Sequence, residues 1–343
     1  MKKSFLSAFI DQQCTVPPVV TADLTDQTIL VVGANVGIGF EAAKHFARMN
    51  PRKLIMACRN ERKGKDAIKE LEQETGYERV ELRLVDLASF ASVTAFAEKF
   101  SGEQDTRLDI LVMNAGVVMG EYGTTEDGWE TTLQVNHLAT ALLSLLLFPH
   151  LSKSSSPEKP SRLVIVSSDM HYMTKVTPEI MESSSTTLRT LSSEEYSNRV
   201  GLSSRYTESK LLNVFFVRAL AAHLARRDVT PVAVNPGFCY SQLRRSTYSQ
   251  PLKNFFMVSL EKVMAWTTEQ GGRQLVYAAI GGREDEGNIW AGYVSRGGVV
   301  EVSDFVLSEK GAKMQAKVWD ETIQILSSVS DRVGEIGKEY FIA

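Results

Sequence analysis

The sequence has 343 residues, of which 43% are hydrophobic and 23% are charged. This composition supports a large buried core and excludes a disordered chain, and α/β folds of this length often form one domain. The formal net charge of -3 provides no broad positive field, which argues against nucleic acid as a partner. We therefore expect a single globular domain over residues 25–343, preceded by an N-terminal extension over residues 1–24.

The cysteines and the apolar runs favour a reducing, cytoplasmic setting. Cys14, Cys58 and Cys239 are widely spaced and form no C-x-x-C pair, so neither a disulfide framework nor a metal site is predicted. The apolar stretch 5–10 is too short for a usual secretory signal peptide. The longest apolar run, 138–148, is shorter than the roughly 20 residues of a membrane-spanning helix, so membrane contact is not expected.

From residue 28 onward, short aliphatic runs alternate with longer helical patterns. The predicted strands are 28–32, 53–57, 80–85, 109–113, 162–166, 231–234 and 290–295. The predicted helices are 38–49, 63–74, 90–100, 129–147, 206–226, 269–279 and 308–328. Such alternation is typical of a parallel sheet covered by helices on both faces. The sequence therefore predicts a doubly wound, Rossmann-type α/β fold with about seven parallel strands.

Three segments interrupt this alternation. Residues 152–161 are rich in Ser, Pro and Lys, and residues 183–204 are rich in Ser and Thr, so both are predicted to be surface loops. The third segment, 240–267, mixes large apolar side chains with few strong helix breakers and could form a lid.

A glycine-rich turn lies between the first predicted strand and the first predicted helix. Glycine is needed where a turn requires a positive φ or where backbone approaches a pyrophosphate, and the following helix offers N–H groups to phosphate oxygens. Glycines are common in ordinary turns, but their place within a βαβ unit favours a dinucleotide site. The residues expected to contact the cofactor here are Gly33, Asn35, Val36, Gly37, Ile38 and Gly39.

The end of the second predicted strand indicates which cofactor binds. An acidic residue at this place would bind the ribose 2′-hydroxyl of NAD, whereas residues 57–60 read Ala-Cys-Arg-Asn. Arg59 can hold a 2′-phosphate with its forked guanidinium, so the sequence favours NADP(H). A solvated surface arginine is the alternative interpretation.

The sequence resembles the classical short-chain dehydrogenase/reductase family from about residue 28 to residue 295. The family's G-x-x-x-G-x-G spacing is present, although Val32 replaces the threonine that usually precedes the first glycine. Further motifs follow in the family's order: Asp86-Leu87, Asn114-Ala115-Gly116, Asn136, Ser167-Ser168, Tyr206-x-x-x-Lys210 and Asn235-Pro236-Gly237. Their local sequences look most like the retinol-dehydrogenase-like branch and its fungal relatives, whose members act on apolar aldehydes, ketones or alcohols.

The resemblance implies a catalytic tetrad of Asn136, Ser168, Tyr206 and Lys210. Four residues apart on a helix, the tyrosine and the lysine would share one face, and a nearby ammonium lowers the pKa of a tyrosine so that it can exchange a proton with substrate. Ser168 would donate to the reacting carbonyl, Lys210 would bind the nicotinamide ribose, and Asn136 would hold a water that relays protons. Ser167, one step back on the strand, is the alternative serine.

The resemblance also implies further contacts with the cofactor along the strand ends. These involve Asp86 and Leu87 beside the adenine, Asn114, Ala115 and Gly116 after the fourth strand, Tyr206 and Lys210, and Pro236, Gly237 and Ser241 around the nicotinamide and phosphates. His171 lies three residues beyond Ser168 and is more readily explained by a structural hydrogen bond than by a catalytic role.

These features predict an NADP(H)-dependent oxidoreductase that transfers a hydride between nicotinamide and an apolar ketone, aldehyde or alcohol, with Tyr206 as general acid/base. Reduction is favoured because NADP pools are usually kept reduced. The apolar segment 255–266 fits a hydrophobic ligand but is explained equally well by core packing. The alternative function is a catalytically silent NADP(H)-binding sensor or scaffold. Relatives often dimerise through the helices that would begin near residues 129 and 206, so a homodimer is expected.

Overall fold

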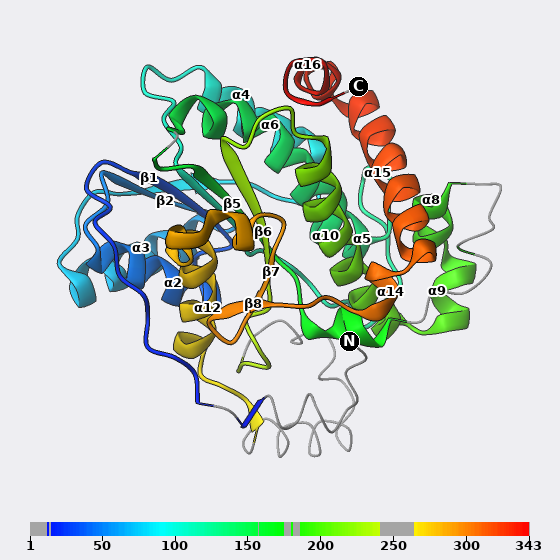
Figure 1. Ribbon diagram of the computed structural model, residues 1–343, viewed down its shortest axis with the longest axis horizontal. Helices are drawn as coiled ribbons and strands as arrows, with labels where there is room; N and C mark the ends of the chain where they lie inside the picture. Colours follow the sequence, from blue (N-terminus) through cyan, green and yellow to red (C-terminus); the bar gives the residue numbers. More distant parts are fainter. Residues whose placement is uncertain are drawn as a thin grey trace.

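The computed structural model describes residues 12–13, 15–156, 158–174, 180, 186–240 and 264–342. At its centre lies one eight-stranded sheet with helices on both faces (Figure 1). The strand order is β3-β2-β1-β4-β5-β6-β7-β8, and neighbouring strands are parallel except for the last pair. The predicted doubly wound α/β fold is therefore confirmed, with one strand more than the seven predicted.

The strands that occupy the middle of the sheet are mostly apolar and are buried along their whole length. The eight strands are β1 (Thr28–Val32), β2 (Lys53–Cys58), β3 (Val80–Leu84), β4 (Ile110–Met113), β5 (Ser161–Val166), β6 (Val229–Val234), β7 (Tyr293–Ser295) and β8 (Gly298–Val300). Every residue of β1, β4, β5 and β6 is buried, as expected for parallel strands covered on both faces. Such runs are recognisable in the sequence without any alternation of polar and apolar residues.

The unpredicted strand β8 forms a tight hairpin with β7. Arg296 and Gly297 connect the two strands with φ values of 57° and 70°, and Ser295 pairs directly with Gly298. A two-residue connection with both φ values positive matches the right-handed twist of the strands that it joins. With only three residues after this turn, β8 carries no periodicity from which it could have been predicted.

Two helical layers cover the sheet and make the two main parts of the core. On one face lie α2 (Gly37–Arg48), α3 (Glu61–Thr75) and α12 (Thr268–Ile280). On the other face lie α4 (Phe90–Ser101), α6 (Ala139–Ser154) and α10 (Leu202–His223). The shorter helices are α5 (Thr131–Leu133), α8 (Thr187–Ser192), α9 (Glu194–Val200), α13 (Glu286–Ile289) and α14 (Asp304–Leu307), with 3₁₀ turns η2 (Asp169–Met173) and η4 (Arg283–Asp285).

Helices α5 and α6 are joined by a π-helical turn, η1 (Gln134–Leu138), into one long helical segment. The segment continues through Pro149 to Ser154, so the loop predicted from residue 152 begins later than expected. Residues 131–154 are long and apolar enough to cross a membrane, but 94% of the most apolar window is buried inside the protein. This segment is therefore a core helix of the fold.

The prediction of a surface loop over residues 183–204 is wrong for residues 187–192, 194–200 and 202–204, which are helical. Leu188, Leu191 and Tyr196 are buried and anchor α8 and α9 to the core. One of the hydroxyl residues caps a helix, since the Ser193 side chain accepts a hydrogen bond from the Tyr196 N–H at the start of α9. A composition rich in Ser and Thr therefore does not exclude helices here.

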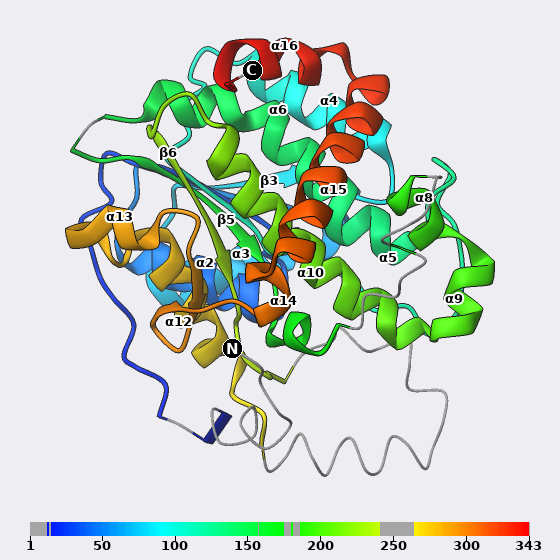
Figure 2. The same ribbon diagram turned by 45° about the vertical axis from the view of Figure 1, so that its right-hand side comes forward.

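The C-terminal helices α15 (Glu309–Val329) and α16 (Asp331–Tyr340) form an outer layer over α10 and α6 (Figures 1 and 2). Trp319 of α15 stacks on His223 with ring centroids 4.8 Å apart, and Tyr340 of α16 packs edge-on against Phe148 at 5.4 Å. Helices α6 and α10 are consequently enclosed between the sheet and the C-terminal part of the same chain.

Candidate active site

The glycine turn after β1 has the geometry that a phosphate site requires. Gly33 and Gly37 have φ values of 83° and 64°, in the left-handed region that favours glycine. A Cβ atom on Gly39 would lie 2.3 Å from the carbonyl oxygen of Gly33, so no larger residue fits there. No side chain caps the N-terminus of α2 at Val36, which leaves the first N–H groups of the helix for an anion. These residues fit the pyrophosphate of a dinucleotide.

The turn after β4 closes against the glycine turn. Asn114 Nδ2 donates to the carbonyl oxygen of Gly33 at 2.8 Å, and a Cβ on Gly33 would lie 2.7 Å from Ala115 Cα. The next residue faces the predicted tetrad, since a Cβ on Gly116 would lie 3.2 Å from Asn136 Oδ1 and 3.7 Å from Lys210 Nζ. Residues 114–116 therefore lie between the glycine turn and the tetrad, as a cofactor spanning both would need.

Arg59 and Asp86 follow neighbouring strands at the edge where the adenine end of a dinucleotide would lie. The Arg59 side chain is 65% exposed, and its Nη1 lies 3.9 Å from Asp86 Oδ2. Asp86 Oδ1 also accepts a hydrogen bond from Ala88 N at 3.0 Å, and Leu87 is buried beside it. The guanidinium is thus held at the end of β2 by a carboxylate and is open to solvent on its other side.

Tyr206 and Lys210 share one face of α10. Lys210 Nζ lies 5.5 Å from the centroid of the Tyr206 ring and donates to the carbonyl oxygen of Val166, at the end of β5, at 2.9 Å. Lys210 is fully enclosed, and this burial lowers its pKa to about 8. Asn213, one turn further along the helix, donates to the same carbonyl at 3.1 Å.

Asn136 is fixed by three hydrogen bonds from two sides. Its Oδ1 accepts from Val117 N at 2.8 Å, while its Nδ2 donates to Val117 O at 2.9 Å and to Ser209 Oγ at 3.0 Å. Asn136 lies in η1, and π-helical turns of this kind are frequent at functional sites. The side chain thereby ties the loop after β4 to the helix that carries Tyr206 and Lys210.

The structure distinguishes the two serines after β5. Ser167 is buried, and its hydroxyl donates to the carbonyl oxygen of Lys210 at 2.7 Å. Ser168 Oγ accepts from Met170 N at 3.2 Å, which leaves its own proton able to donate to a substrate oxygen. This arrangement supports the choice of Ser168 over Ser167.

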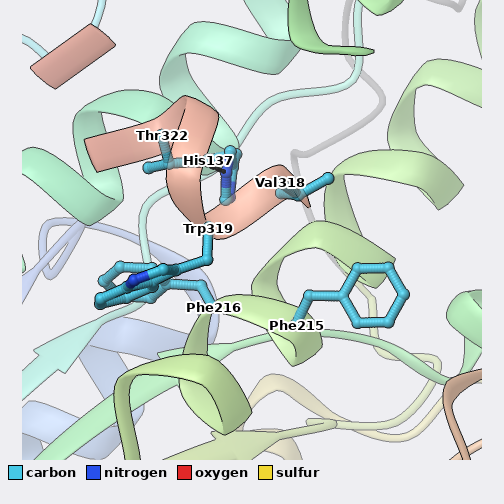
Figure 3. Close-up of a pocket in the computed structure, with 6 residues that line it drawn as sticks. All are labelled: His137, Phe215, Phe216, Val318, Trp319 and Thr322. Carbon is cyan, nitrogen blue, oxygen red and sulfur yellow. Dashed lines mark hydrogen bonds between the residues drawn. The ribbon is translucent and has the colours of Figure 1, made fainter. Parts of the chain in front are cut away.

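Two nearby histidines have structural positions. His171 is buried, with Nδ1 2.9 Å from Ser168 O and Nε2 accepting from Ser303 N at 3.3 Å. His137, next to Asn136, points into a small gap between α10 and α15 that is too small to hold a water molecule (Figure 3). Burial lowers the pKa of His137 to about 4, so this side chain is neutral near pH 7.

The turn after β6 carries Pro236 and Gly237. Gly237 has a φ of 85°, and its N–H donates to Asn235 Oδ1 at 3.1 Å. Ser241 and most of the segment 240–267 lie outside the described residues, so their predicted roles at the cofactor and substrate stay predictions.

Two residues that sequence reasoning missed contribute to this region. Asn213 shares the acceptor of Lys210, and its spacing of three residues from Lys210 on one helix face could have indicated it. Gln12 of the N-terminal extension bonds to Phe238, one residue beyond Gly237. No local pattern could have indicated Gln12, because its partner lies 226 residues further along the chain.

Comparisons with known proteins agree with this geometry. A family model described as short chain dehydrogenase matches residues 27–171. A short chain dehydrogenase of Arthrobotrys oligospora is 35% identical over 312 residues, covering 89% of this chain and 93% of the relative. A short-chain dehydrogenase of Penicillium roqueforti is 35% identical over 344 residues, covering 96% and 85% respectively.

Among solved structures, an uncharacterised protein from Mycobacterium paratuberculosis has a TM-score of 0.62 at 26% identity, over 90% of this chain and 98% of that one. An NADPH-bound carbonyl reductase from chicken fatty liver shares the fold, with a TM-score of 0.56 at 19% identity, over 81% of this chain and 100% of that one. The retinol-dehydrogenase-like branch stays a prediction. The ordered motifs, the sheet and the fungal relatives together show that the chain belongs to the short-chain dehydrogenase/reductase family of oxidoreductases.

Proposed function

We propose that the protein is an NADP(H)-dependent carbonyl reductase or alcohol dehydrogenase in which Tyr206 exchanges the proton. The observation that carries this proposal is the placement of Tyr206 and buried Lys210 on one face of α10, with Nζ 5.5 Å from the ring centroid. A bound nicotinamide would supply or accept the hydride at the carbonyl carbon. In the reducing direction, Tyr206 gives its phenolic proton to the carbonyl oxygen, which becomes the alcohol.

The other members of the tetrad support this proton transfer. The Ser168 hydroxyl donates to the carbonyl oxygen and keeps the substrate in place for attack. The Lys210 ammonium stabilises the phenolate that Tyr206 becomes after it releases its proton. Asn136, held by Val117 and Ser209, positions the water that relays protons to Lys210. We propose an apolar aldehyde or ketone as substrate, on the ground of the resemblance to retinol-dehydrogenase-like enzymes.

The test of the proton donor is NADPH oxidation against a panel of apolar aldehydes and ketones. Tyr206→Phe removes only the hydroxyl, so we expect it to lower kcat by about 10²-fold to 10⁴-fold, the usual contribution of general acid catalysis. Tyr340→Phe, which alters a tyrosine of α16, is the matched control and should keep wild-type turnover. Unchanged turnover in Tyr206→Phe would refute the mechanism, whereas cofactor binding without turnover in the wild type would favour the silent sensor.

The preference for NADP(H) depends on Arg59. The exposed guanidinium can bind a 2′-phosphate bidentately, while Asp86 holds it at the end of β2. We expect Arg59→Asp to weaken NADPH binding by roughly 10²-fold, because the variant loses one charge-assisted contact and its carboxylate repels the phosphate. NADH affinity should change much less. Arg62→Ala, a neighbouring exposed arginine, serves as the control, and a retained preference for NADPH in Arg59→Asp would rule out this assignment.

We further propose a reducing, cytoplasmic location. Within the part of the chain that the structure describes, Cys58 and Cys239 are buried and form no disulfide. Burial raises the pKa of the Cys239 thiol to about 12, which makes this thiol unreactive near pH 7.

A further inference from the structure

Residue 12 of the N-terminal extension binds the backbone directly after the Pro236-Gly237 turn. Gln12 is buried, its Nε2 donates to Phe238 O at 2.8 Å, and its Oε1 accepts from Phe238 N at 3.1 Å. One side-chain amide thus satisfies both polar groups of a single residue, in the way that a neighbouring strand would. This pairing restrains Phe238 against rotation of its peptide groups.

The same glutamine also holds Trp266. The indole Nε1 of Trp266 donates to the backbone carbonyl oxygen of Gln12 at 2.8 Å. Two backbone bonds join the same segments, from Trp266 N to Phe238 O at 2.8 Å and from Tyr240 N to Trp266 O at 3.0 Å. Gln12 therefore lies at the junction of residues 238–240 and residue 266, and bonds to both.

Trp266 transmits this contact to the predicted nicotinamide pocket. A Cβ on Gly237 would lie 2.4 Å from Trp266 Cε3, so the indole ring packs directly against the backbone of the turn. Val16 of the extension is buried with Cys239 and Trp266, and Ile38 at the start of α2 packs against this cluster. The extension thus contacts both the turn after β6 and the helix that follows the glycine turn.

We propose that Gln12 is a positioning residue for the nicotinamide half of the cofactor site, an inference that rests on the proposed function. Gln12 does not touch the cofactor. It fixes the Trp266 ring, and the ring fixes the Pro236-Gly237 turn before the nicotinamide binds. In Gln12→Ala the Phe238 N–H loses its side-chain acceptor, and Phe238 O loses the Nε2 donor. The backbone carbonyl of residue 12 is then no longer anchored to Phe238 and holds the Trp266 indole N–H less firmly, so the turn has to be ordered by the cofactor itself.

The test compares two ligands on two matched variants by titration calorimetry. Adenosine 2′,5′-bisphosphate occupies the adenosine half alone, whereas NADPH occupies both halves. We expect Gln12→Ala to weaken NADPH binding about tenfold, which corresponds to about 1.4 kcal/mol, and to leave the affinity for adenosine 2′,5′-bisphosphate unchanged. Gln13→Ala, at the exposed neighbouring position, should bind both ligands like the wild type.

A spectroscopic readout accompanies the affinities. The Gln12 side chain anchors to Phe238 the residue whose backbone carbonyl accepts from the Trp266 indole. Gln12→Ala should therefore loosen this contact and shift the tryptophan fluorescence of the free protein, and Gln13→Ala should not. NADPH binding of Gln12→Ala equal to that of the wild type would overturn the inference, and so would equal weakening of both ligands. A wild-type protein that binds adenosine 2′,5′-bisphosphate and NADPH with no turnover of any carbonyl would instead overturn the proposed reaction and leave the positioning role standing.

Discussion

Lys210, the lysine of the proposed tetrad, opposes folding. Its ammonium is fully enclosed, and burial lowers its pKa from 10.5 to about 8. Below pH 8 the lysine is protonated in both the folded and the unfolded chain, and the folded chain bears the full cost of desolvation. Above pH 10.5 it is neutral in both, and the cost vanishes. This group therefore makes the protein more stable as pH rises from about 8 to 10.5.

Replacing this lysine should stabilise the protein without cofactor. The difference between 10.5 and about 8 corresponds to about 3 kcal/mol, which Lys210→Met would recover at pH 7. Val166 O keeps its hydrogen bond from Asn213, so the substitution leaves no unpaired carbonyl. Urea unfolding at pH 7.0 and pH 9.5 measures the difference in the free energy of unfolding between Lys210→Met and the wild type. This difference should be smaller at the higher pH. Lys310→Met, at an exposed position of α15, is the control. A gain in the free energy of unfolding for Lys210→Met that is equal at both pH values would contradict the desolvation cost assigned to Lys210.

The residues that could be predicted are those that motifs place within a few positions of each other. Gly33, Gly37 and Gly39 belong to one turn, and Tyr206 and Lys210 belong to one helix face, so spacing alone brings them together. The resemblance already favours Ser168 over Ser167, and the structure adds that the Ser167 hydroxyl is engaged by the carbonyl of Lys210.

At the scale of elements, the segment between Ser168 and Tyr206 was the hardest to predict. Its helix α8 begins where the Glu321 carboxylate accepts hydrogen bonds from Thr187 N and Leu188 N, each at 2.8 Å. Glu321 belongs to α15, so the partner that stabilises this helix end lies far away in the sequence. A window of hydroxyl residues gives no sign of such a partner, and the segment therefore resembles a loop.

The same segment is joined to α10 by a buried polar network. Tyr196 of α9 donates to Glu208 Oε1 at 2.8 Å, and Arg205 bonds to the other carboxylate oxygen and to Leu191 O. Arg205 also lies over the Tyr196 ring, with its guanidinium carbon 4.3 Å from the centroid. Arg205 and Glu208 lie on either side of Tyr206 in the sequence, so α8 and α9 contribute to the placement of the helix face that carries Tyr206.

At the scale of the whole molecule, the strands were predictable because each central strand is an uninterrupted buried run. Two features were not, namely the short edge strand β8 and the docking of Gln12 and Val16 beside Trp266. Strand β8 is too short to show a periodicity, and the docking of the extension joins residues more than 200 positions apart in the sequence. The sequence therefore predicts the central strands and most polar residues of the candidate site, but it does not predict the contacts that hold the turn after β6.

The outer layer formed by α15 and α16 bears on the expected homodimer. The helices through which relatives often associate correspond to the segment from α5 to α6 and to α10, and here the C-terminal helices of the same chain lie on them (Figure 2). Trp319 and Leu326 of α15 are buried in that contact. We therefore expect a monomer of 38.0 kDa, measured by light scattering during size-exclusion chromatography. A mass of twice that value would contradict this expectation.

The covering helices have a thermodynamic consequence. When a subunit interface protects the core, dilution lowers the unfolding temperature, because dissociation and unfolding are linked by mass action. Here the protecting layer is tethered to the core that it covers, so its local concentration is set by the chain and does not fall on dilution. Helix α10 accordingly keeps its packing against α15 at any protein concentration.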